Sequence, residues 1–114
     1  MSEPTKLAVI WSTAEKEVAQ CTAFMYTLNS MRLGWWQEAR LIIWGPSGRI
    51  LADDDDLQNI IKDMLEEGVK IQACKACSDK LGISEKLTDL GVEVIYIGEQ
   101  FTKILKERWA VITF

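Results

Sequence analysis

The stretch KLAVIW at residues 6–11 decides the fold, because it is a short and uninterrupted apolar run. Such runs are typical of strands that are buried on both faces, as strands are in parallel sheets. ARLIIW at 39–44 repeats the pattern and is followed by the turn residues GPSG at 45–48. Three further runs have the same character, namely VKIQA (69–73), VEVIYI (92–97) and WAVITF (109–114).

Helical patterns separate these apolar runs. From Glu15 to Leu33 the apolar residues recur every three or four positions, which predicts a helix. Its buried stripe is expected to consist of Val18, Cys21, Met25 and Leu28. Cys21 therefore has the character of a small core residue, as free cysteines often do.

The segment ADDDDLQNIIKDMLEEG at 52–68 predicts a second long helix, with its aspartates at the N-terminal end of the helix dipole. Its stripe is expected to consist of Leu57, Ile60, Ile61 and Met64. Shorter helices are expected between 75 and 82, over 84–90 and over 100–108. Because strands and helices alternate throughout, the sequence predicts a single α/β domain over 1–114. We expect a parallel sheet of about five strands with helices on both faces.

Composition argues against several classes of function. The chain of 114 residues has a net charge of −4 and no basic run, which disfavours direct binding to nucleic acid. No apolar run is long enough to span a membrane, and the N-terminus lacks the pattern of an export signal, so a cytoplasmic location is expected. The chain has no histidine, which excludes a Ser–His–Asp triad, a Cys–His pair and a histidine-containing metal site within this chain.

The ends of the predicted strands suggest a pocket, because ligands of open parallel sheets bind beyond the carboxyl ends of the strands. Ser12 follows the first strand, Trp44 and Ser47 lie at the end of the second, and Lys75 lies just after the third. We expect these four residues to line a candidate pocket. Trp11 suits either that pocket or the core. GPSG lacks the lysine and the glycine spacing of a P-loop, so a plain turn is favoured there.

Cys74 and Cys77 form a Cys-x-x-Cys pair within VKIQACKACSDKLGI at 69–83. A closed zinc site needs four ligands, and neither a second pair nor a histidine is present, so no metal is expected. Cys74 follows a strand and precedes a helix, where backbone N–H groups and Lys75 or Lys80 are expected to lower the pKa of the thiol. Cys77 would lie about one helical turn away, a spacing that is compatible with a disulfide.

Four segments together resemble the DsrE/DsrF-like family, whose members include sulfur-relay subunits of the TusD type and YchN-type proteins. They are KLAVIW, YTLNSMRLGWW, LIIWGPS and GVKIQACKACSDKLGI. The resemblance covers about residues 6–114 and is most specific at 69–83. It implies a compact parallel α/β fold and assembly into trimers or hexamers. Independently of the resemblance, the adjacent Trp35 and Trp36 after the first helix suggest that one of them lies in a subunit interface. No organic cofactor is implied.

In the sulfur-trafficking members of this family, the cysteine that directly follows the third strand carries a persulfide, and by position it matches Cys74. The resemblance thus implies a sulfur carrier or sulfurtransferase that passes sulfane sulfur between thiol and persulfide proteins. Cys77 departs from the TusD type, which has a small apolar residue there. Two alternatives stay open: a Cys74/Cys77 dithiol–disulfide redox protein, and a non-enzymatic oligomeric binding module.

Overall fold

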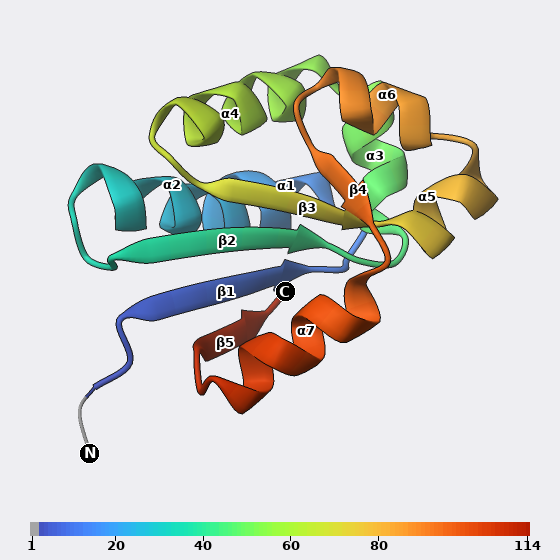
Figure 1. Ribbon diagram of the computed structural model, residues 1–114. Coiled ribbons are helices and arrows are strands. Elements are labelled where there is room, and N and C mark those ends of the chain that lie inside the picture. The colour runs from blue at the N-terminus through green and yellow to red at the C-terminus, as the bar shows by residue number, and fades with distance from the viewer. Residues whose placement is uncertain (1–2) are drawn as a thin grey trace.

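The computed structural model describes residues 3–114 as an α/β domain built on a five-stranded sheet (Figure 1). All strand pairs are parallel, and the strand order is β4-β3-β2-β1-β5. The strands are β1 (Lys6–Trp11), β2 (Glu38–Ile43), β3 (Lys70–Cys74), β4 (Glu93–Ile95) and β5 (Ala110–Thr113). The helical elements are α1 (Lys16–Val18), the π-helical turn η1 (Ala19–Ala23), α2 (Phe24–Arg32), α3 (Ser47–Asp53), α4 (Asp55–Glu66), α5 (Lys75–Leu81), α6 (Ser84–Asp89) and α7 (Ile97–Lys106). The fold class predicted from the sequence is confirmed.

The two faces of the sheet are covered unequally. Helices α1 to α4 and α6 lie on one side of the sheet, and α7 lies on the other (Figure 1). On the first face, Val9 and Leu41 belong to a core that includes Phe24 of α2 and Ile61 of α4. On the second face, a smaller cluster joins alternate strand residues to α7, namely Ala8, Ile10, Ile42, Cys74, Ile97 and Ile104. Among residues 3–114, no helix is long and apolar enough to cross a membrane.

The stripe predicted for the first helix is wrong at two positions, because Cys21 and Met25 are exposed. The buried side of this helix consists instead of Ala19, Ala23, Phe24, Thr27 and Ser30. The π-helical turn η1 explains the difference. It inserts one residue into the helix and so moves the buried face by about 100° around the axis. Cys21 is therefore a surface thiol and not a core residue.

The acidic segment forms two helices where the sequence predicted one. α3 ends at Asp53, and Asp54 then adopts an extended conformation before α4 begins. The Asp54 carboxylate accepts a hydrogen bond from the Leu57 N–H at 3.0 Å, which caps α4. Asp55 and Asp56 occupy the first turn, so the predicted acidic helix start is confirmed. Within the stripe, Ile60 is only partly buried.

The predicted strand 92–97 is shortened to three residues. β4 lies at the edge of the sheet, and its pairing with β3 ends where Ile95 lies beside Cys74. The chain then turns at Tyr96 and enters α7 at Ile97, three residues earlier than the sequence predicted. This early start places Ile97 against the second face of the sheet, next to the end of β3.

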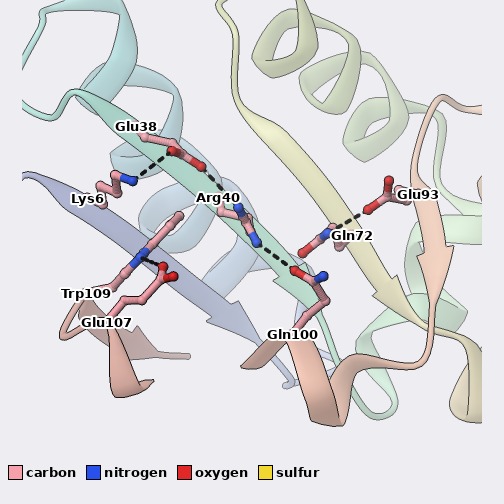
Figure 2. Close-up of polar contacts among 8 residues, drawn as sticks. All are labelled: Lys6, Glu38, Arg40, Gln72, Glu93, Gln100, Glu107 and Trp109. Atoms are coloured by element: carbon pink, nitrogen blue, oxygen red, sulfur yellow. Dashed lines mark hydrogen bonds and ion pairs between the residues drawn. The ribbon is translucent and has the colours of Figure 1, made fainter. Parts of the chain in front are cut away.

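The second face also carries polar side chains that span several strands (Figure 2). Arg40 of β2 contacts Glu38 at 3.1 Å and Gln100 of α7 at 3.4 Å, and its guanidinium lies 4.7 Å from the centre of the Trp109 ring. Gln72 of β3 is 1% exposed and donates to Glu93 of β4 at 2.6 Å. Since only α7 covers this face, these side chains pack against one another across the strands.

We expect Arg108→Gly to stabilise the protein. Arg108 follows the end of α7 with a φ of 60°, a left-handed conformation that costs a residue with a side chain about 1–2 kcal/mol. Glycine avoids this cost but loses roughly 0.5–1 kcal/mol of backbone freedom, so a net gain of about 0.5–1 kcal/mol should appear in denaturant unfolding. Lys103→Gly, at an exposed residue inside α7, is the matched control and should destabilise the protein. An equal loss of stability in both variants would contradict the argument.

Candidate functional site

Cys74 is the last residue of β3 and is held in place by pairing with Ile95 of β4. α5 begins at the next residue, so the chain passes from strand to helix without a loop. Only 7% of Cys74 is exposed, because it belongs to the apolar cluster of the second face together with Ile42 and Ile97. The predicted nucleophile thus lies at the rim of the sheet but is closely surrounded.

Cys77, on the first turn of α5, lies beside Cys74: it packs against the same apolar cluster, and both residues line one small cavity. Burial raises the pKa of the Cys77 thiol, and a hydrogen bond to Cys74 raises it further. Smaller effects in the opposite direction come from the backbone N–H of Gly45 and from the positive charge of Lys80. Burial and the neighbouring Cys74 thus favour the thiol form of Cys77 over its thiolate.

The side chain of Lys75 pairs with another residue of α5. Its ammonium forms an ion pair with Asp79 at 2.7 Å and lies 5.7 Å from the centre of the Tyr96 ring. The Asp79 carboxylate raises the pKa of Lys75. From the sequence, the charge of Lys75 was expected to lower the pKa of the Cys74 thiol. In the structure this charge is paired with Asp79, whereas the charge of Lys80 lowers the pKa of Cys77.

The other candidate pocket residues serve mainly to connect elements. Ser47 is fully buried and donates to the Trp11 carbonyl at 2.6 Å, which ties α3 to the end of β1. Ser12 donates to the Phe114 carbonyl at 3.1 Å. Trp44 packs edge-to-face on Phe101 of α7, with 5.2 Å between ring centres, and belongs to the same apolar cluster as Cys74. Trp11 is fully buried in the core.

A small cavity of about 10 Å³ lies beside the two cysteines. Its lining is Ile43, Gly45, Gly48, Ala73, Cys74, Cys77, Ser78, Leu81, Ile83 and Leu87. The sequence indicated only the cysteines, because the other residues come from the ends of β2 and β3 and from α3, α5, α6 and their connections. The GPSG turn was a partial signal. Gly45 in this turn has a φ of 89°, and its N–H lowers the pKa of Cys77.

No group of three or more cysteine, aspartate or glutamate side chains is arranged to share a metal ion in the part of the chain that the structure describes. Cys21 is exposed on η1, whereas Cys74 is buried and Cys77 is half-buried. The site is thus a pair of neighbouring free thiols.

The DsrE/DsrF-like family matches residues 35–114. Among solved structures, a conserved protein of unknown function from Bacteroides thetaiotaomicron, BT1422, is 34% identical, with a TM-score of 0.93 over 96% of this chain and 95% of that chain. YchN from E. coli is 17% identical, with a TM-score of 0.72 over 98% and 100% of the two chains. MTH1491 from Methanobacterium thermoautotrophicum, also of unknown function, is 16% identical, with a TM-score of 0.72 over 98% and 100%. No curated protein matches this chain.

The pH at which Cys77 reacts should depend on Cys74. In a Cys21→Ser background, Cys74→Ala removes the hydrogen bond and the charge that raise the pKa of Cys77, so the midpoint of alkylation against pH should fall. Lys80→Gln removes a positive charge that lowers this pKa, and it should move the midpoint upward. The rate of iodoacetamide labelling between pH 7 and 11 measures both effects. An unchanged midpoint in Cys74→Ala would show that the two thiols are not coupled.

Proposed function

Because the chain belongs to the DsrE/DsrF-like family, we propose that it is a cytoplasmic sulfur carrier in which Cys74 bears a persulfide and passes sulfane sulfur between protein thiols. The observation that carries this proposal is the position of Cys74 at the junction of β3 and α5, with the thiol of Cys77 beside it. A thiolate is the nucleophile in sulfur exchange, so Cys74 acts in its thiolate form.

Loading of the carrier is a sulfur transfer without net oxidation. The Cys74 thiolate attacks the outer sulfur of a donor persulfide, and the sulfur–sulfur bond of the donor breaks. The donor leaves as a thiolate with the electron pair of that bond, and Cys74 becomes a persulfide. An acceptor thiolate then repeats the same exchange on the outer sulfur and returns Cys74 to a thiolate. Because Cys74 is buried, a protein donor or acceptor requires movement of the residues that cover it.

A second candidate, a dithiol–disulfide protein, is favoured by the same pair of neighbouring thiols, Cys74 and Cys77. In a loaded carrier, the Cys77 thiolate can attack the inner sulfur, the Sγ of Cys74. The bond between the two sulfur atoms of the persulfide then breaks, hydrosulfide leaves, and a Cys74–Cys77 disulfide forms. An external dithiol reductant must then restore the two thiols. In this mode the protein releases sulfide instead of transferring sulfane sulfur.

Intact mass after incubation with a persulfide donor tests both candidates. Wild type should gain about 32 Da for one sulfur atom, and Cys74→Ser should lose most of this gain, since its hydroxyl is a far weaker nucleophile. If Cys77 resolves the persulfide, wild type should release hydrosulfide and lose about 2 Da, whereas Cys77→Ser should retain the added sulfur. A Cys77→Ser protein that passes sulfur on normally favours the carrier. If no variant changes in mass, both candidates are contradicted, and the remaining alternative is a non-enzymatic binding module.

We also propose that the chain assembles into a trimer or hexamer through an apolar surface near the end of α2. Trp35 is 55% exposed and packs beside Tyr26, with 5.7 Å between ring centres. Met25 and Leu33 are exposed nearby in the chain, whereas Trp36 turns inward and packs against the core. Exposed aromatic clusters of this kind mark protein interfaces.

Trp35→Lys should reduce the molar mass of the assembly, because it places a charge in this apolar surface. Light scattering during size-exclusion chromatography measures that mass. Leu105→Lys, which adds the same charge at an exposed residue of α7, is the matched control and should leave the assembly intact. A wild-type monomer at micromolar concentration, or dissociation in the Leu105 variant alone, would overturn this proposal.

A further inference from the structure

The cavity beside Cys74 and Cys77 has room for about one atom. Its volume of about 10 Å³ is close to that of a single sphere of the size of water. Both cysteines line it. Gly45, in the turn after β2, also lines it.

The lining suits a weakly polar atom better than it suits water. Most of it comes from aliphatic side chains and glycines. Ser78 contributes a hydroxyl, but this group already contacts the Lys75 carbonyl at 3.2 Å and the Ser84 hydroxyl at 2.6 Å. A buried water usually makes two to four hydrogen bonds, which this lining supplies poorly. Sulfur forms only weak hydrogen bonds and loses less when it is buried there.

We propose that this cavity holds the outer sulfur atom of the persulfide and limits the site to one sulfane sulfur. The inference rests on the proposed function and names its substrate class as donors of a single terminal sulfur atom, such as inorganic polysulfide. The Cys74 thiolate attacks the terminal sulfur of the polysulfide, and the adjacent sulfur–sulfur bond breaks. A polysulfide that is one atom shorter leaves with the electron pair. The pocket is partly open, but its volume does not hold a second sulfur atom, which would lie in the opening without the contacts of the lining.

Gly48 offers a way to fill the cavity without touching either cysteine. A Cβ at this residue would lie 3.1 Å from Ile83 Cδ1, 3.7 Å from Ile43 Cγ2 and 3.8 Å from Leu87 Cδ1. All three neighbours line the cavity. Gly48 lies in α3 without the left-handed conformation that would disfavour alanine. Ile83→Val makes the opposite change, because it removes one methylene group from the lining.

The experiment is intact mass spectrometry of the full chain in a Cys21→Ser background, after incubation with inorganic polysulfide and removal of the excess. Four proteins are compared: the background itself, Gly48→Ala, Ile83→Val and Ile61→Val. Ile61 is buried in α4 outside the cavity lining, so its variant loses the same methylene group elsewhere in the core. Circular dichroism and thermal unfolding confirm that each protein is folded.

The background protein should gain one sulfur atom, about 32 Da, and not a series of additions. Gly48→Ala should reduce the loaded fraction about tenfold at a limiting donor concentration, the scale expected for one extra methyl group in a tightly packed lining. Ile83→Val should accept a second sulfur, about 64 Da in total, whereas Ile61→Val should match the background. If Gly48→Ala does not fold, the comparison of Ile83→Val with Ile61→Val tests the role of the cavity by itself.

Two outcomes separate this inference from the proposed function. If the background protein gains no sulfur, the proposed function is contradicted, and the role of the cavity is contradicted as well. A background protein that gains several sulfur atoms on Cys74, or loading that is the same in all four proteins, leaves the carrier intact but overturns the role of the cavity.

Discussion

The pairing of β3 between β2 and β4 is the constraint on which the site depends. Parallel pairing fixes the register of Ile43 beside Ala73 and of Cys74 beside Ile95. Since α5 begins at the residue after Cys74, the register also fixes where the first turn of that helix lies. A shift of one residue would turn Cys74 to the other face of the sheet and separate it from α7. The position of the thiol is therefore set by backbone hydrogen bonds along the whole strand.

The unequal cover of the two faces gives the cysteines different surroundings. Cys74 packs on the second face, where α7 is the covering helix, whereas the cavity beside it is lined largely by elements of the first face. Cys77 lies between these regions, since it packs against the cluster of the second face and also lines the cavity. A sulfur atom that arrives at Cys74 would therefore lie beside a second thiol and an apolar cavity.

Several parts of the fold and site were predictable because they depend on local sequence. Continuous apolar runs such as KLAVIW predicted the strands, and the aspartates of the DDDD segment predicted the start of α4. The spacing of Cys74 and Cys77 predicted two neighbouring thiols. The π-helical turn η1 was not predictable from the apolar spacing, since one inserted residue rotates the face and exposes Cys21. The short length of β4 was also not predictable from the sequence, because it depends on the position of this strand at the edge of the sheet, with one pairing partner.

The sequence by itself determined the parallel α/β class and the placement of Cys74 at the end of a buried strand, because hydrophobic periodicity and chain order carry both. Only the tertiary structure decided what surrounds that thiol. The ion pair of Lys75 with Asp79, the Gly45 N–H at Cys77 and the atom-sized cavity between α3, α5 and α6 join residues that are distant in the chain or depend on side-chain conformation. Chain spacing does not encode such contacts, since they depend on how the helices pack on the finished sheet.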